Sequence, residues 1–316
     1  MRSRPVASSN GWRQRINNNF RSYRRSAGLL SMAIPVMLFF VLFNYAPMVG
    51  LVIAFKDYVI TDGIFGSRWV GLDNFRRLFG SEDFPRAVGN TLTISFLRLG
   101  FGFFAPIVLA LLLNEVRSQF YKRGVQTLTY LPHFFSWVIL GGIFLMLFNS
   151  QGPANQFVKM VGGKPINFLT DDVWFIVILI ATGIWQAAGW GAIIYIASLT
   201  SIPPQLYEAA EIDGANRWQQ TWSVTIPSLV PTMITLFILS IGGILTAGFD
   251  QVYNMYNPLV FDVADIIDTY VLRRMMDLDL SLGTAAGMFK SVVGLILVVS
   301  SNWLAKRMTG GEQGVW

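Results

Sequence analysis

Two cations stand inside apolar stretches of the 316-residue chain, where a charge is unusual. Arg98 lies seven residues after Thr91, and Lys290 lies seven residues after Gly283. Neither stretch contains an acidic residue that could neutralise its cation. An unpaired charge in a membrane-spanning helix costs roughly 2.5–3.5 kcal/mol at the centre and less toward the ends. We therefore expect both side chains either to extend to lipid headgroups or to form a cationic throat for an anionic ligand.

Polar and aromatic side chains elsewhere in the apolar stretches could contact a sugar. Gln186 and Trp190 are four residues apart, so a helix places them on one face. An amide beside an aromatic plane suits a sugar ring, which has apolar faces and hydroxyl edges. The chain's one histidine, His133, follows a proline that should bend its helix. His133 and Trp190 could instead serve packing. The hydroxyls of Ser240 and Thr246 could bond their own helix backbone.

Several kinds of chemistry are excluded by residues that are missing. The chain has no cysteine and one histidine, so it has neither a thiol nucleophile nor a metal cluster of these residues. It also lacks the G-x-x-x-x-G-K-[ST] phosphate loop and the H-E-x-x-H zinc motif. We expect no catalytic residue and no metal site. Ion-coupled carriers usually need acidic residues within their spans, so we expect the energy to come from another protein.

The composition indicates a polytopic membrane protein. The chain is 53% hydrophobic and 13% charged, about half the charge of ordinary soluble domains. Six stretches exceed the ~20 helical residues that cross a bilayer core: 29–55, 91–114, 125–148, 173–199, 229–249 and 284–304. Backbone polar groups must be satisfied within lipid, so the sequence predicts an all-α integral membrane fold with six transmembrane helices.

Positive charges near the span ends predict the orientation, because cytoplasmic loops are enriched in Lys and Arg. The tail 1–28 carries seven arginines and no acid, so it should be cytoplasmic, as should the tail 306–316 after six crossings. Between them we expect a first span with an outer loop at 29–90 and a core at 91–305. The loop 200–228 should also be cytoplasmic, yet it has one arginine against three acids. The charges of this loop therefore reflect a constraint other than the orientation of the chain in the membrane.

This loop contains the sequence SIPPQLYEAAEIDGANRWQQTWSVTIPS. Its two adjacent prolines should end the preceding span, and Tyr207–Asp213 is a strong helix former. Gly214 should break that helix, since glycine readily takes left-handed backbone angles. A second segment, Ala215–Val224, carries two tryptophans on one face, and Pro227 should open the next span. We expect a bent helix–Gly–helix element whose small-residue face fits the groove of another protein.

The spacing in this loop resembles the cytoplasmic signature of permease subunits of binding-protein-dependent ABC importers. The matching positions are Glu208-Ala209-Ala210, Gly214, Val224, Ile226 and Pro227. Val and Ile stand where the signature often has Ile and Leu. Other segments resemble the oligosaccharide and polysaccharide branch of sugar-type permeases, which includes alginate-importer permeases: FNYAPMVGLVIAFKDY, WVGLDNF, YLPHFFSWVILGGI, GFDQVYNMYNPLV, DTYVLRR and FKSVVGLILVVSSNWLAKR.

The resemblance implies the type I ABC importer permease fold and a set of partners. These are a homologous but different permease chain, two ATPase subunits that bind ATP and Mg, and an extracytoplasmic substrate-binding protein. This chain itself would bind no cofactor and no nucleic acid. It would contact an oligosaccharide and membrane lipids in the bacterial inner membrane. By match to the motif, coupling to the ATPase falls on residues of the loop: Glu208, Ala209, Ala210, Asp213, Gly214 and Pro227.

In this family, transport sites lie near the membrane midplane in helices on both sides of the loop. The resemblance therefore makes pathway candidates of six intramembrane side chains: Arg98, His133, Gln186, Trp190, Ser240 and Lys290. The two cations favour an acidic saccharide such as a uronate oligomer. Two other functions remain open. An ion-coupled secondary sugar carrier predicts dependence on an ion gradient, and a membrane enzyme acting on glycans predicts turnover by the purified chain.

Overall fold

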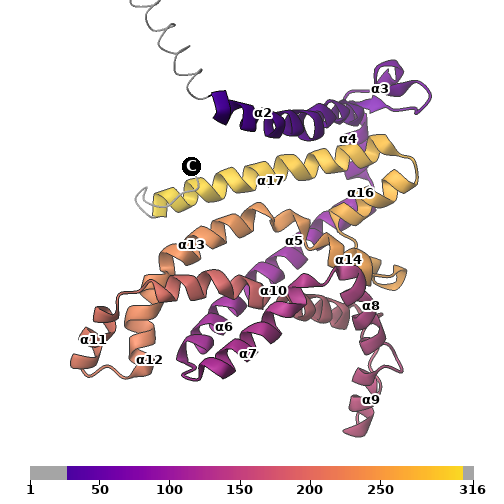
Figure 1. Cartoon of the computed structure of the whole chain (residues 1–316). Coiled ribbons are helices and arrows are strands. Elements are labelled where there is room, and N and C mark those ends of the chain that lie inside the picture. Colours follow the sequence, from indigo (N-terminus) through magenta and orange to yellow (C-terminus); the bar gives the residue numbers. More distant parts are fainter. Residues whose placement is uncertain (1–26, 309–316) are drawn as a thin grey trace, which may run out of the picture.

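The computed structural model describes residues 27–308, and most of them lie in helices (Figure 1). Six helical runs are long and apolar enough to cross a membrane: Ser31–Phe55, Asp83–Glu115, Trp137–Met160, Asp172–Thr200, Arg217–Gly242 and Leu280–Trp303. The predicted all-α fold and the number of spans are confirmed. The predicted tails 1–28 and 306–316 lie almost wholly outside the described residues.

Short helices and a two-stranded sheet connect the spans. The spanning runs contain α2 (Ala27–Phe40), η1 (Val41–Tyr45), η2 (Ala46–Phe55), α5 (Asp83–Gly102), α6 (Phe104–Glu115), α8 (Trp137–Phe148), α9 (Pro153–Met160), α10 (Asp172–Thr200), α12 (Arg217–Gln220), η4 (Thr221–Thr225), α13 (Ile226–Gly242) and α17 (Leu280–Met308). The other elements are β1 (Lys56–Asp57), α3 (Gly63–Gly66), β2 (Arg68–Trp69), α4 (Asp73–Gly80), α7 (Gln119–Tyr130), η3 (Leu131–Phe134), α11 (Pro204–Ile212), η5 (Ile244–Thr246), α14 (Phe249–Met255), η6 (Pro258–Val260), α15 (Phe261–Ala264) and α16 (Ile267–Met276). The strands pair antiparallel, with Lys56 opposite Trp69.

The third predicted span is divided, whereas the sequence indicated one bent helix at 125–148. It consists of α7, the 3-10 turn η3 and the first part of the run that begins at Trp137. Pro132 lies in the first turn of η3. A proline has no N–H to donate to the preceding turn, and its ring clashes with the carbonyl four residues earlier, so α7 cannot continue through it. The expected bend is therefore a complete interruption.

The fifth span also differs from its predicted range of 229–249. Its helical run starts twelve residues earlier, at Arg217, and ends at Gly242. Beyond that point the backbone turns sharply, because Ala247 and Gly248 take left-handed angles with φ of 45° and 70°. The left-handed region is disfavoured for a residue with a Cβ, so Ala247 is held there by its surroundings.

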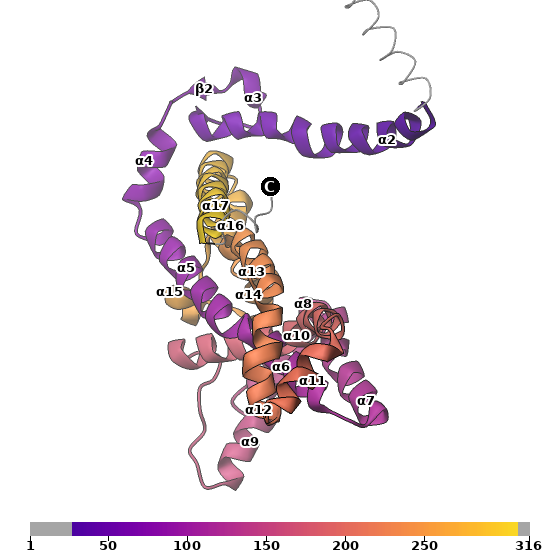
Figure 2. The same ribbon diagram turned by 90° about the vertical axis from the view of Figure 1, so that its left-hand side faces the viewer.

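The helix α10 occupies the centre of the bundle and contacts α5, α6, α7 and α13 (Figure 1). The loop helices α11 and α12 lie at one end of the molecule, and α3, α4 and α16 lie at the opposite end (Figure 1). The first helix, α2, runs away from the other helices, while η2 contacts α17 (Figure 2). Apolar side chains on this first span are exposed, such as Met32 at 76% and Phe43 at 67%. A surface of this kind suits contact with lipid.

Three hydrophobic clusters hold the helices together. The largest surrounds Phe175 and Leu179 of α10 and includes side chains of α5, α8 and α14. A second contains Phe84 and Tyr270 and joins α5 to η2, α4, α16 and α17. The third joins α6, α10 and α13. Because α5 and α10 each contribute to two clusters, they form the frame on which the other spans are arranged.

Candidate functional site

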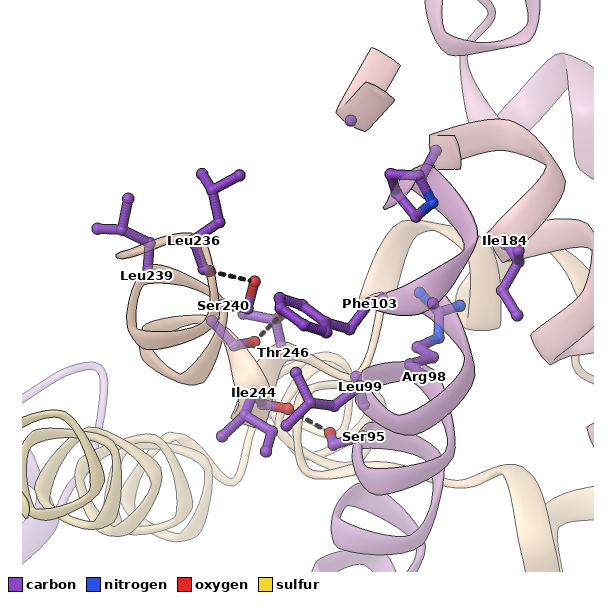
Figure 3. A pocket seen from close by; sticks show the side chains of 18 of the residues that line it. Ser95, Arg98, Leu99, Phe103, Ile184, Leu236, Leu239, Ser240, Ile244 and Thr246 are labelled. Carbon is purple, nitrogen blue, oxygen red and sulfur yellow. Dashed lines mark hydrogen bonds between the residues drawn. The ribbon is translucent and has the colours of Figure 1, made fainter. Parts of the chain in front are cut away.

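A cavity of about 570 Å³ lies between α5, α6, α10, α13 and the turn that follows α13 (Figure 3). Small residues on one face of α10 leave the space: Gly183, Ala187 and Gly191 recur every four residues. Most of the remaining lining is apolar, including Leu99, Phe103, Ile184, Leu236 and Leu239 (Figure 3). Among the described residues that line it, Arg98 alone carries a charge.

Arg98 is half-buried as a residue, and its guanidinium donates to the Gln251 Oε1 atom of α14. Its Nε is buried and has no hydrogen-bond partner among the described residues. The sequence predicted that no carboxylate of the spans neutralises Arg98 and that its side chain extends to lipid or to a ligand. The amide of Gln251 is a neutral partner that the sequence did not indicate, and Arg98 forms no ion pair with a described carboxylate. The unused Nε–H still leaves a donor for another acceptor.

Lys290 is paired, which corrects the expectation of a second free cation. Its Nζ lies 2.6 Å from both carboxylate oxygens of Asp268. Lys290 is in α17 and Asp268 in the first turn of α16, and both side chains are mostly buried. Asp268 lies outside every predicted span, so a search for acids within the spans could not find it. With its charge neutralised, Lys290 contributes little to a cationic throat.

His133 and Trp190 are brought together, although they lie far apart in the sequence. Their rings stack with centroids 4.6 Å apart and planes 4° from parallel, and Phe134 meets Trp190 edge to face. The side chain of Gln186 is half-buried, one turn before Trp190. None of His133, Gln186 and Trp190 lines the cavity. Their role in a pathway stays a prediction.

Ser240 and Thr246 line the cavity from the α13 side (Figure 3). Both hydroxyls donate to backbone carbonyls of their own turn, Ser240 to Leu236 at 2.8 Å and Thr246 to Gly243 at 2.7 Å. These bonds correspond to the structural alternative for the two hydroxyls. Each oxygen can still accept a hydrogen bond from a ligand.

The loop between α10 and α13 forms the predicted bent element. The helix α11 ends before Gly214, whose φ is 79°. The side chain of Asn216 then caps α12 in a reciprocal capping box with Gln219. Tyr207 of α11 and Thr225 of η4 share a hydrogen bond of 2.9 Å between their hydroxyls, which ties the two arms together. The glycine thus sets the bend, and the hydrogen bond between Tyr207 and Thr225 holds the segments on its two sides together.

Most of the predicted coupling residues lie on the outside of this bend. Glu208, Ala209, Asp213 and Gly214 are exposed, and Ala210 is half-buried. Pro227 lies at the start of α13 as expected, although helical structure already begins before it, at Arg217. It lies in the first turn of α13 directly after the π turn η4. A π turn shifts the hydrogen-bond spacing and allows a residue without N–H within the run.

A six-span bundle with an exposed helix–Gly–helix loop at one end has the features of an ABC importer permease. Residues 102–310 match the family described as binding-protein-dependent transport system inner membrane component, and the chain belongs to that family. Two relatives come from Bacillus subtilis strain 168. The polygalacturonan/rhamnogalacturonan transport system permease protein YteP is 46% identical over 290 residues, covering 91% of this chain and 90% of YteP. Protein LplB is 45% identical over 286 residues, covering 90% of each chain.

Solved structures share the same fold. A chain in the crystal structure of a bacterial ABC transporter involved in the import of the acidic polysaccharide alginate is 40% identical, with a TM-score of 0.86. The match covers 92% of this chain and 99% of that chain. A bacterial alginate ABC transporter in complex with an alginate pentasaccharide-bound periplasmic protein gives the same identity and TM-score, with 94% and 99% covered.

These matches define the chain as a multi-pass membrane protein and a permease subunit of a sugar-type ABC importer. It is a transport component and not an enzyme. The comparisons give no support to an ion-coupled secondary carrier or to a glycan-modifying enzyme.

Proposed function

We propose that this permease forms part of the pathway for an acidic oligosaccharide built from uronate units. The observation that carries the proposal is Arg98, the one charge among the described residues that line the membrane cavity. A guanidinium in apolar surroundings attracts a carboxylate more strongly than it does in water. Its planar donors match the geometry of a carboxylate group.

The relatives support an acidic substrate. Alginate is the acidic polysaccharide named for the solved transporter, and polygalacturonan is named for YteP. Both polymers carry a carboxylate on their uronate units. A single carboxylate-binding cation in the pathway would be useful for either polymer, and this chain places one in a cavity of about 570 Å³.

The assembly we propose contains a second permease chain, two ATPase subunits and an extracytoplasmic binding protein. The ATPase subunits would hold ATP and Mg. The exposed loop residues Glu208, Ala209, Ala210, Asp213 and Gly214, with Pro227 behind them, would seat in the ATPase and transmit its closure as rigid-body motion of the spans. In this arrangement α11 faces the cytoplasm with both termini, and α4 and α16 face outward, consistent with the arginine-rich start of the chain.

Reconstituted uptake tests the proposal with two ligands that differ only in charge. Proteoliposomes would contain this chain, its partner permease, the ATPase and the binding protein. Trigalacturonate and its fully methyl-esterified form have the same sugar units, and the ester carries no charge. We expect ATP-dependent uptake of trigalacturonate, several times faster than uptake of the ester at saturating ligand, and no effect of a protonophore. Equal uptake of both ligands, or uptake driven by an ion gradient without ATP, would overturn the proposal.

A further inference from the structure

A second cavity, of about 610 Å³, adjoins the first on the side of α14 and α16. Its lining combines apolar side chains such as Trp137 with the carboxylates of Asp250 and Asp268. Thr246 and Gly248 line both cavities, so the turn between η5 and α14 is part of the wall that separates them.

Arg98 is held against this turn in a slot made by two glycines. A Cβ added at Gly248 would overlap the guanidinium of Arg98. A Cβ added at Gly183 would lie 3.4 Å from the Arg98 Nη2 atom and 2.9 Å from the Gln251 Oε1 atom. The absence of both side chains lets the guanidinium of α5 lie between α10 and the start of α14.

The partner of Arg98 has its amide orientation fixed by other bonds. Gln251 is completely buried. Its Nε2 donates to the carbonyl of Leu179 and to the hydroxyl of Thr182, both at 2.8 Å. Because both acceptors lie on α10, the amide nitrogen must face that helix, and Oε1 must face Arg98. One side chain thus connects α14 to α10 through its nitrogen and to α5 through its oxygen.

We propose that the Arg98–Gln251 bond is a latch that a substrate carboxylate releases. The amide oxygen of Gln251 is a neutral acceptor, whereas a sugar carboxylate is charged and can bind two guanidinium donors at once. The buried Nε of Arg98, which has no described partner, lies on the same edge of the guanidinium as the Nη2 bound to Gln251. A carboxylate in the first cavity would displace the amide from Nη2, and this movement would uncover the buried Nε as its second donor.

Release of Gln251 from Arg98 would remove the hydrogen bond between α14 and α5, while the bonds of Gln251 to α10 remain. The preceding turn η5 would stay joined to α5 by the bond from the Ser95 hydroxyl to the Ile244 carbonyl. The wall at Thr246 and Gly248 could then move and join the two cavities. The carboxylate that makes the substrate acidic would thus also cause the passage between the two cavities to open. This inference rests on the proposed acidic substrate but adds a link between substrate binding and the movement of α14.

A distance measurement between α5 and α14 tests the latch without a substitution in it. The chain has no native cysteine, so Phe96→Cys and Tyr253→Cys place one spin label on each helix. Both original side chains are exposed, at 63% and 43%. In complexes with cysteine-free partners and without nucleotide, we expect trigalacturonate-loaded binding protein to change the distance distribution between the labels. The methyl ester should leave the distribution unchanged.

Variants of Gln251 give the second arm of the test. Gln251→Glu supplies Arg98 with a permanent carboxylate of nearly the same size but removes the two hydrogen bonds that Nε2 donates to α10. The labels should not respond to trigalacturonate, and its uptake should fall about tenfold. Gln156→Glu makes the same change on the exposed surface of α9 and should respond as the parent chain does. Size-exclusion chromatography would show whether each complex assembles.

The outcomes separate the latch from the proposed function. Selective uptake of trigalacturonate with an unchanged α5–α14 distance would overturn the latch and leave the acidic substrate in place. A normal ligand response in Gln251→Glu would also overturn the latch. Equal uptake of the acid and its ester would overturn the proposed function itself.

Discussion

The Lys290 Nζ lies 2.6 Å from both carboxylate oxygens of Asp268, so the cation in the last span is neutralised from the helix beside it. Each of the two side chains is less than a quarter exposed. A pair of this kind stabilises little relative to apolar residues, but removing one partner leaves a desolvated charge. The pair therefore joins α16 to α17 and leaves Lys290 without a free charge for a ligand, while its partner Asp268 lines the second cavity.

The first prediction concerns this pair. We expect Lys290→Met and Asp268→Asn each to lower the stability of the purified protein by about 1–3 kcal/mol, because each leaves the other charge without a partner. The double variant should recover much of that loss. Thermal unfolding in detergent would measure all three. Neither single change should alter the preference for acidic over neutral saccharide. Loss of acidic uptake alone in Lys290→Met would instead restore Lys290 as a pathway cation.

The second prediction concerns Arg98. Arg98→Gln removes the charge from the cavity and should reduce uptake of an acidic trisaccharide by about ten- to a hundredfold, with a much smaller effect on its neutral ester. Arg98→Lys keeps the charge but loses the planar donors, so an intermediate effect is expected. Uptake across ionic strengths in proteoliposomes would measure these changes. Equal losses for both ligands would indicate that Arg98 acts only in packing.

The sequence was sufficient for features that depend on local composition. The spans follow from apolar length, and the bend of the coupling loop follows from Gly214, which takes a φ of 79°. At Pro132 the sequence predicted a bend in one helix, and the structure shows that the helix is interrupted completely. These features are set by residues within one or two helical turns, which is why the pattern of the chain reveals them.

The partners of the two cations could not be predicted, because they depend on tertiary contacts. Gln251 lies 153 residues from Arg98, just beyond the predicted end of the fifth span. Asp268 lies 22 residues from Lys290 but outside the spans. The cavity itself is made by small residues of α10 such as Ala187, and not by the polar side chains that drew attention there. The small residues at every fourth position of α10 were the sequence signal that could have indicated this cavity.

The third prediction concerns the face of α10 that carries Gln186 and Trp190. If this face borders the pathway, single cysteines at the two positions should react with a water-soluble thiol reagent, and substrate should protect them. Trp190→Ala should then weaken substrate-stimulated ATPase activity, whereas Trp185→Ala, an exposed tryptophan of the same helix, serves as the matched control. Trp190 stacks on His133, so the loss of packing must be checked by thermal unfolding. Complete lack of labelling in every nucleotide state would assign both residues to packing.

The fourth prediction concerns the coupling loop and uses two glycines with nearly the same backbone angle. Gly214 and Gly162 have φ of 79° and 81°, and a Cβ at either position would meet open space. Valine at either position should therefore cause a similar local backbone strain of about 1–2 kcal/mol, since the left-handed region disfavours a branched side chain. Only Gly214 lies in the bend that we assign to the ATPase. We expect Gly214→Val to abolish most substrate-stimulated ATPase activity and uptake while the protein remains in the membrane, and Gly162→Val to have little effect.

Glu208→Lys tests the same interface by charge. Its side chain is exposed, so the substitution should be tolerated by the fold but should place a cation where we propose that the ATPase binds. Copurification of the ATPase, followed by substrate-stimulated ATPase activity in proteoliposomes, separates loss of binding from loss of coupling. We expect Glu208→Lys to weaken copurification, because its change lies on the proposed contact surface. Gly214→Val should retain some binding but lose stimulation, because its change alters the bend between α11 and α12. If both variants kept normal stimulation, the loop would not transmit ATPase closure, and the coupling path would have to run through another exposed segment at that end of the molecule.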